Sequence, residues 1–183
     1  IDSTCRVTGF TIQNGIGCVY GQGAGIYVES ASPRLDNLII KNNVGGTNGG
    51  GICLNGNSNS FINNVMIQNN SADTGGGLYI SNSSPVITNS VIQNNHSNNG
   101  AGVFFELCSP NFENVSITDN YAVSSGGGVY CGLTSYPVLN HVTISNNSAS
   151  YGGGIVSTQN SQPIFSNSIL WNDSPEEIVS HPD

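Results

Sequence analysis

The side chains of this chain that can do acid, base or metal chemistry are few and scattered. Its 183 residues include 3 Lys+Arg, 11 Asp+Glu and 3 His. Hydrolysis of a glycosidic bond needs two carboxylates about 5 to 9.5 Å apart. Elimination from an acidic polysaccharide instead needs carboxylates gathered around a cation, together with a basic group. The acidic residues form no such cluster in the sequence, and the clustered aspartates and Gly-His-Gly of polygalacturonases are absent.

The histidines and cysteines show no spacing typical of metal ligands. His96, His141 and His181 are far apart, and the five cysteines contain no Cys-x-x-Cys. A bridge between Cys5 and Cys18 is one candidate pairing, and we expect the other three cysteines to be free thiols: Cys53, Cys108 and Cys131. We therefore expect no metal and no cofactor.

The charge balance excludes one large class of partner. A formal net charge of −8 leaves almost nothing to neutralise phosphates, so we expect no nucleic-acid binding. No apolar run approaches the roughly 20 residues that span a bilayer, and no charged-then-apolar leader opens the chain. We expect a soluble fragment or a processed protein.

Glycine triplets mark an internal repeat. Their last members are spaced by 26, 26, 25, 26 and 26 residues, a regularity that identifies a repeat architecture. The triplets are Gly23-Ala24-Gly25, Gly49-Gly50-Gly51, Gly75-Gly76-Gly77, Gly100-Ala101-Gly102, Gly126-Gly127-Gly128 and Gly152-Gly153-Gly154.

The residues that follow each triplet alternate as in a half-buried strand. Positions 1 and 3 after the triplet are mostly apolar and are predicted to face inward. The position between them is predicted to face outward, and it is occupied in turn by Tyr27, Cys53, Tyr79, Phe104, Tyr130 and Val156. A Ser/Asn/Pro turn then ends the strand.

The second half of each unit carries two asparagine columns. A typical copy reads Ile62-x-Asn64-Val65-x-Ile67-x-x-Asn70. Asparagine at such corners can hydrogen-bond to its counterparts one coil above and below, so we predict stacked ladders. The ladder residues are Asn37, Asn64, Asn89, Asn114 and Asn167 in one column, and Asn43, Asn70, Asn95, Asn120 and Asn147 in the other. His141 is interpreted as a substitute in the first column, and residues 5–15 as a degenerate copy with Val7, Phe10 and Ile12 at apolar positions.

This pattern predicts an all-β, right-handed parallel β-helix of about six to seven coils of 25–26 residues. Glycine triplets disfavour helices, and β-branched residues dominate the apolar positions. A leucine-rich-repeat horseshoe is the alternative, because its period and asparagine pattern overlap. We divide the chain into an irregular first coil (1–24), five to six regular coils (25–173) and a C-terminal tail able to cap the last coil (174–183).

The motifs resemble known repeats. The Gly-Gly-Gly-[Ile/Leu/Val] triplets and Phe61-x-x-Asn64 are similar to the Gly-Gly-Ala-Ile and Phe-x-x-Asn motifs of polymorphic outer-membrane protein repeats. More broadly the chain resembles surface β-helix repeats of the pectin-lyase-like superfamily, and residues 163–172 are similar to the closing coil of secreted bacterial surface β-helix proteins. The resemblance implies the fold and a secreted or cell-surface location. It implies little about activity, since such repeats occur in adhesins, passenger domains and enzymes alike.

Two outward columns are candidate binding surfaces. The first contains the aromatic residues Tyr27, Tyr79, Phe104 and Tyr130, which either form a platform for sugar rings and flat partner surfaces or only cover the sheet. The second is moderately apolar and is formed by Ile39, Met66, Val91, Ser116, Thr143 and Ile169. A loop or a neighbouring subunit is an alternative cover for this second column.

Three functions follow as hypotheses. The first is a non-catalytic adhesin or carbohydrate-binding module whose partner is a glycan or a host or neighbouring-cell surface. The second is a structural spacer or filament subunit that associates end to end, because an open solenoid exposes strand edges. The third is a polysaccharide lyase or hydrolase. The coil spacing weighs against the third, since it puts Glu29 and Glu106 three coils and roughly 14 Å apart.

Overall fold

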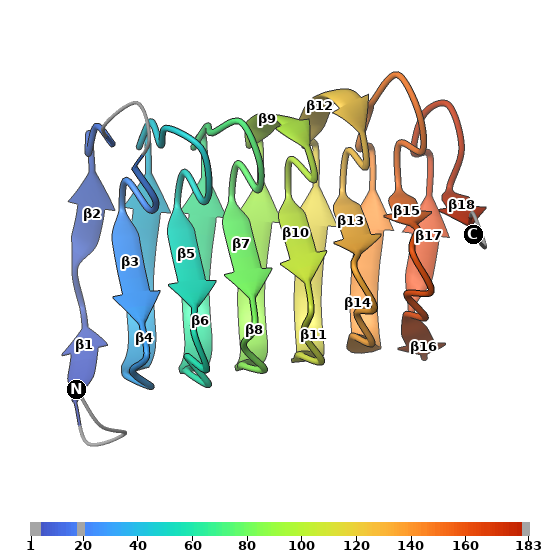
Figure 1. Cartoon of the computed structure of the whole chain (residues 1–183). Coiled ribbons are helices and arrows are strands. Elements are labelled where there is room, and N and C mark those ends of the chain that lie inside the picture. Colours follow the sequence, from blue (N-terminus) through green and yellow to red (C-terminus); the bar gives the residue numbers. More distant parts are fainter. Residues whose placement is uncertain (1–4, 18–20, 181–183) are drawn as a thin grey trace.

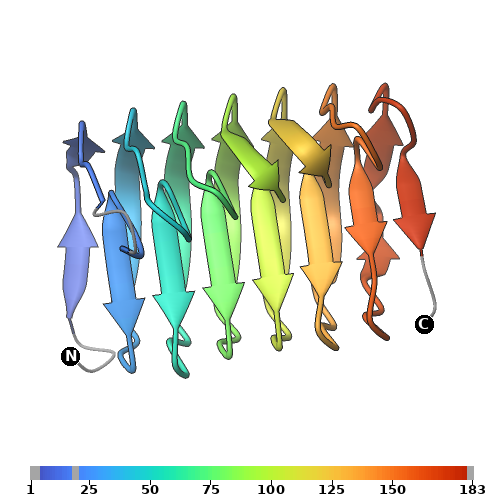
Figure 2. The same ribbon diagram turned by 45° about the horizontal axis from the view of Figure 1, so that its top comes forward.

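The computed structural model describes residues 5–17 and 21–180, and in this part of the chain all paired strands are parallel and no helix is present. The backbone winds into a solenoid of about seven turns, with like strands of successive turns side by side (Figures 1 and 2). The described residues therefore include no helix long and apolar enough to cross a bilayer.

Two large sheets run along the solenoid. The first contains β1 (Arg6–Thr8), β2 (Thr11–Gln13), β4 (Arg34–Lys41), β6 (Phe61–Gln68), β8 (Val86–Gln93), β11 (Asn111–Thr118), β14 (Val138–Ser145), β16 (Ile164–Ser166) and β17 (Ile169–Trp171). The second contains β3 (Ile26–Glu29), β5 (Ile52–Asn55), β7 (Leu78–Ser81), β10 (Val103–Glu106), β13 (Val129–Gly132), β15 (Ile155–Ser157) and β18 (Ile178–Ser180). A small third sheet pairs β9 (His96–Asn99) with β12 (Tyr121–Ser125) across one corner (Figure 1).

The interior is a stack of identical positions. Ile40 pairs with Ile67, Ile67 with Ile92, and the register continues through Ile117 and Ile144. All five side chains have an exposed fraction of 0%. Like-over-like stacking therefore buries the aliphatic columns, and the predicted parallel β-helix is confirmed. The horseshoe alternative is wrong for the described residues, because both halves of each repeat are strands.

The eight-residue strands bend in the middle, where an asparagine, or His141 in β14, adopts a left-handed conformation. Asn64 has φ 53°, and the equivalent residue has positive φ in each strand of this type. Asparagine tolerates this region better than most residues because its short amide can bond to the nearby backbone. The bend lets both Ile62 and Val65 point inward, although they are three residues apart.

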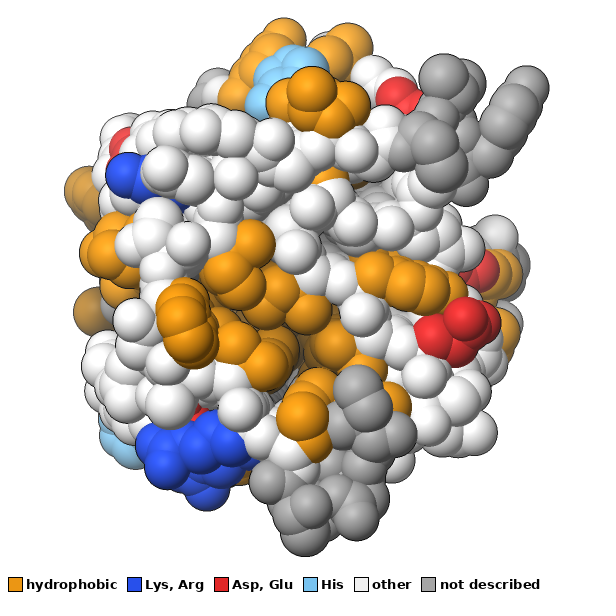
Figure 3. Space-filling view, turned by 90° about the vertical axis from the view of Figure 1, so that its left-hand side faces the viewer, with side chains coloured by type: hydrophobic (Ala, Val, Ile, Leu, Met, Phe, Trp, Pro, Cys, Tyr) orange, Lys and Arg blue, Asp and Glu red, His pale blue; other side chains and the backbone are white. Residues whose placement is uncertain are grey.

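At the N-terminal end two arginines neutralise a buried acid. Arg34 Nε lies 2.6 Å and Arg6 Nε 2.9 Å from Asp36 Oδ2. Burial alone would raise the pKa of Asp36, but the two guanidinium groups outweigh it and hold that pKa below its ordinary value. The view onto this end shows hydrophobic side chains gathered in the middle of the section (Figure 3). Phe10, expected at an apolar position, is instead 62% exposed.

Candidate ligand-binding faces

The asparagines of the second column form a buried ladder that runs the length of the rod. Asn95 Oδ1 accepts from both the backbone N and Nδ2 of Asn70, at 3.0 and 3.1 Å. Asn95 Nδ2 donates onward to Asn120 Oδ1 at 3.0 Å and to the carbonyl of Ile67 at 3.1 Å. The same bonds recur at Asn43, Asn70, Asn120 and Asn147. The ladder is a structural device with no face toward solvent, since these five side chains are at most 1% exposed.

The ladder ends at an aspartate. Asp173 Oδ1 accepts from the backbone N and Nδ2 of Asn147, at 2.7 and 2.8 Å. Its Oδ2 lies in the position that Nδ2 has elsewhere, next to the third glycine of the triplet, and has no hydrogen-bond partner among the described residues. Burial, together with the neighbouring Glu177 carboxylate, raises the pKa of Asp173 to about 6.

Asp173→Asn is expected to stabilise the last rung at neutral pH, by on the order of 2 kcal/mol in the free energy of unfolding. The folded state holds a proton on Asp173 between about pH 4 and 6 that the unfolded chain releases. Stability from this group is therefore greatest at acid pH and is lost as the pH rises through 6. Urea titrations at pH 4 and 7 measure the effect, and the variant should lose that part of the pH dependence. An equal pH dependence in both proteins would contradict the assignment.

The aromatic column is a stack of rings in contact with one another. The Tyr79 and Phe104 centroids are 5.6 Å apart at 15°, and those of Phe104 and Tyr130 are 4.8 Å apart at 4°. Tyr27 is separated from this stack by Cys53 and is 42% exposed. The faces of the three stacked rings cover one another, so the stack presents ring edges to its surroundings, and it is less open than an array of separate platforms.

The column is also more buried than its outward position predicted. Cys53 is 0%, Tyr79 7% and Val156 1% exposed. The backbone of the preceding corner lies on the base of each residue: a Cβ added at Gly75 would lie 2.8 Å from Tyr79 Cβ. The hydroxyl of Tyr79 donates to the Glu106 carboxylate. The alternation of apolar residues correctly predicted that these side chains point away from the core. It did not predict that the preceding corner of the chain covers them.

A hollow of about 280 Å³ lies beside the stacked rings. Its lining combines the three rings with polar groups from neighbouring turns, among them Asn48, Thr74, Glu106 and Gln159. Apolar edges bordered by a few polar groups are typical of small-ligand sites. The aromatic face thus offers one candidate site on the sheet of β7, β10 and β13.

The asparagines of the first column form an exposed and discontinuous row at the bend of the long strands. Asn64 Nδ2 donates to Asn37 Oδ1 at 2.7 Å, and Asn114 Nδ2 to Asn89 Oδ1 at 2.8 Å. Asn89 does not bond to Asn64; its amide donates to Asn63 Oδ1 at 2.9 Å. Further along, Asn167 donates to Asn140, and His141 Nδ1 lies 3.1 Å from Glu113 Oε1.

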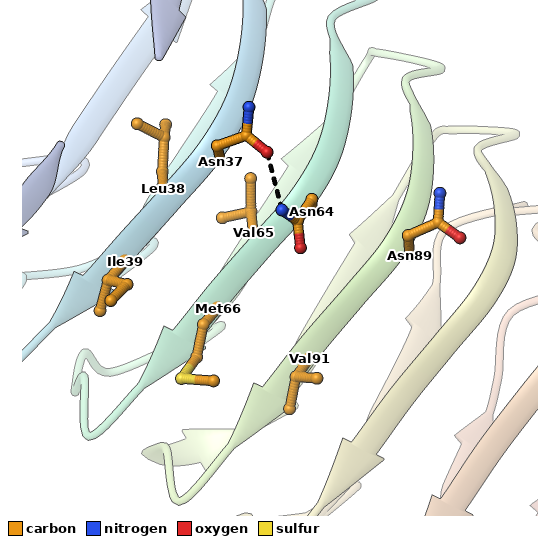
Figure 4. Close-up of a pocket in the computed structure, with 8 residues that line it drawn as sticks. All are labelled: Asn37, Leu38, Ile39, Asn64, Val65, Met66, Asn89 and Val91. Atoms are coloured by element: carbon orange, nitrogen blue, oxygen red, sulfur yellow. Dashed lines mark hydrogen bonds between the residues drawn. The ribbon is translucent and has the colours of Figure 1, made fainter. Parts of the chain in front are cut away.

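A shallow groove lies next to this amide row (Figure 4). Its first part has a volume of about 260 Å³ and lies between the amides and the apolar residues two positions further along each strand. The close-up shows Asn37, Asn64 and Asn89 on one side and Ile39, Met66 and Val91 on the other. A second hollow of about 270 Å³ continues it past β11 and β14, and Asn89 and Val91 line both. The sequence indicated both columns but not that they enclose a groove.

Among the described residues the strand register pairs no two carboxylates, although Asp173 and Glu177 lie close together at the C-terminal end, where Asp173 is buried as the last rung of the ladder. Glu29 and Glu106 have equivalent places on β3 and β10, with β5 and β7 between them. Two of the three basic side chains are engaged by Asp36. No group of three or more His, Cys, Asp and Glu side chains able to hold a metal ion occurs among residues 5–17 and 21–180.

The described cysteines are free thiols: Cys5, Cys53, Cys108 and Cys131. Burial raises the pKa of Cys53, Cys108 and Cys131, which keeps these thiols protonated and poorly nucleophilic. Because Cys5 is free, the candidate Cys5–Cys18 bridge is wrong on the Cys5 side, and Cys18 lies outside the described residues. His181 lies outside them too.

Parallel turns, inward aliphatic stacks and a buried asparagine ladder define a β-solenoid of the right-handed β-helix class. The right-handed beta helix region family matches residues 2–138, about three quarters of the chain, and the chain belongs to that family. A second family, the Chlamydia polymorphic membrane protein repeat, matches residues 141–158. Searches of the curated proteins and of the solved structures each find no match.

Proposed function

We propose that this chain is a non-catalytic β-helix segment, secreted or displayed at a cell surface, that binds carbohydrate through its aromatic face. The observation that carries the proposal is the hollow beside Tyr79, Phe104 and Tyr130, with its border of amide, hydroxyl and carboxylate groups. Such groups suit the hydroxyls of a sugar, and the rings add apolar contact surface beside them. The match of residues 141–158 to a repeat named for a membrane protein supports the surface location.

A non-catalytic role is supported by what the acidic residues do in the fold. Glu106 accepts a hydrogen bond from Tyr79, Glu113 pairs with His141, and Asp36 is held by two arginines. Hydrolysis by a pair of carboxylates requires two of them flanking one bond. Three of the acids thus have other partners, and Glu29 and Glu106 are three strands apart.

Tyr130→Ala is expected to weaken glycan binding about tenfold, the effect of losing roughly 1.4 kcal/mol of contact energy. Tyr130 is the suitable residue because it is half-buried and its hydroxyl makes only a 3.3 Å contact with Thr158 in addition to the stacking. A glycan array, followed by titration of each glycan that binds, measures the change.

Tyr136→Ala is the matched control, since Tyr136 is 40% exposed and lies outside the hollow. It should bind as the wild type does. Equal loss in both variants, or no glycan bound by the wild type at millimolar concentration, would contradict the proposal.

The second candidate is a structural spacer or filament subunit. It is favoured by an apolar hollow of about 410 Å³ at the N-terminal end, lined by Val7, Val28 and Leu35 among others. A further turn of strand packed there would cover the partly exposed Val7 and Ile26. The same array separates the candidates, because a spacer would bind no glycan and would be indifferent to Tyr130→Ala.

A further inference from the structure

We infer that the groove along the bend of β4, β6, β8, β11 and β14 is a second ligand site, which binds a neutral, linear polysaccharide lying along the rod. It belongs to the other large sheet, so it shares no lining residue with the aromatic hollow. The two sites can therefore fail separately.

The groove is long and periodic. Its two parts share Asn89 and Val91, and together they extend from the turn of Asn37 to the turn of His141. Five parallel strands at about 4.8 Å give a length of about 19 Å. Four of the five turns present an asparagine amide, and His141 takes its place on β14. In every turn a second lining side chain follows two residues later. A site built from repeated elements suits a ligand that is itself a chain of repeated units.

One wall of the groove supplies hydrogen bonds from fixed positions. The side-chain amides of Asn37, Asn64 and Asn89 are exposed. The backbone of each of these residues has a positive φ and is fixed by the flanking strand pairing. The row is interrupted between Asn64 and Asn89, and Asn64 Oδ1 accepts no hydrogen bond from another described residue. This carbonyl oxygen is an acceptor available to a ligand hydroxyl. Donors and acceptors held in this way bind with little loss of side-chain entropy.

The opposite wall is apolar over β4, β6 and β8, and Ser116 and Thr143 continue it over β11 and β14. Ile39 is 40% exposed, and Met66 and Val91 are partly exposed beside it (Figure 4). His141 is the only titratable residue in the lining, and the chain as a whole has a net charge of −8. An acidic polymer would be repelled, and a basic one would find no carboxylate in the lining. Hydroxyls on one edge and C–H groups on a face are the features of a neutral sugar chain.

The double variant Met66→Thr/Val91→Ser tests the site without disturbing the fold. Thr143 and Ser116 already occupy the same column on β14 and β11, so each substitution introduces a residue type that this column contains. Native gels containing hydroxyethylcellulose, galactomannan or arabinoxylan measure retardation of the full chain, and polygalacturonate serves as the acidic comparison. We expect at least one neutral polymer to retard the wild type and to bind the double variant about tenfold more weakly.

The length of the ligand supplies a second measurement. For oligosaccharides of the polymer that binds, affinity in calorimetry should rise with chain length until the oligosaccharide spans the groove. Tyr136→Ala, which lies outside both sites, should bind these polymers as the wild type does, and the unfolding temperature of the double variant should match that of the wild type.

Several results would overturn the inference. They are a wild type retarded by no neutral polymer, one retarded by the acidic polymer alone, and an undiminished interaction in the double variant. If Tyr130→Ala abolishes polymer binding while the double variant retains it, the aromatic hollow is the only site. The proposed function would then stand and the groove would not.

Discussion

Replacing Asn95 by alanine is expected to lower the free energy of unfolding by about 4 kcal/mol, through the loss of one rung of the buried ladder. The side chain takes part in four hydrogen bonds, two as acceptor from Asn70 and two as donor to Ile67 and Asn120. Alanine removes all four at a position that is only 1% exposed.

The cost comes chiefly from the groups left behind. The backbone N–H of Asn70 and the carbonyl of Ile67 would be buried without these partners, and each such group costs about 1 to 3 kcal/mol. Each turn of a solenoid contacts mainly its neighbours, so the damage also weakens the pairing of β6 with β8 and of β8 with β11.

Urea unfolding followed by circular dichroism measures the change. Asn98→Ala is the control, because Asn98 is exposed on β9 and its side chain makes no hydrogen bond within the described chain. It should stay within about 0.5 kcal/mol of the wild type. If Asn95→Ala unfolded at the same urea concentration as this control, the hydrogen bonds of the ladder would not contribute measurably to the free energy of unfolding.

Much of the fold could be predicted from the sequence because the repeat allows equivalent positions of about seven turns to be compared with one another. One copy of Ile67-x-x-Asn70 says little, but its recurrence at Ile92-x-x-Asn95 and Ile117-x-x-Asn120 shows that the same packing problem is solved in each turn. The period, the inward columns and the parallel register all follow from this recurrence.

The candidate sites were less predictable, because they depend on how corners and rings lie. Alternation placed Cys53 and Tyr79 on the outer side of the strand, yet the corner before each strand covers them. It gave the order of Tyr79, Phe104 and Tyr130 but not the contact of their faces, which follows from rotamers and the spacing of the turns. The groove along the bend of the long strands likewise depends on the positive φ of the asparagines at the bend. Residue spacing alone does not reveal that the amide column and the apolar column two residues later enclose a groove.

The buried ladder and the exposed groove use the same residue for opposite purposes. Asn70 is buried, and its side chain donates a hydrogen bond to the backbone carbonyl of Ile40. Asn64, on the strand just before it, is exposed, and its Oδ1 accepts no hydrogen bond from another described residue. A scaffold held by its interior leaves the outward columns free to vary, as the change from Met66 to Ser116 in one column illustrates. Binding properties of such a rod can therefore change without loss of the fold.

Gly102→Ala is the second substitution expected to have a large effect, about 3 kcal/mol or more of destabilisation. A Cβ at Gly102 would lie 2.5 Å from the carbonyl oxygen of Gly128, 2.8 Å from Ile117 Cγ2 and 3.0 Å from Asn120 Nδ2. The first of these atoms is backbone of the next turn and cannot swing away, so the turns must move apart. The third is a ladder amide, so the same methyl group would also strain the hydrogen bonds of Asn120. The last residue of all six triplets is glycine, in agreement with this close approach.

Gly132→Ala is the matched control, since its Cβ would meet Tyr130 Cε1 at 3.1 Å as its nearest neighbour, and its three nearest neighbours are all side-chain atoms. Chemical denaturation should show a shift for Gly102→Ala several times that for Gly132→Ala. Comparable shifts would mean that the turns can part by the width of a methyl group, and the close approach of each glycine to the next turn would then be dispensable for the stack.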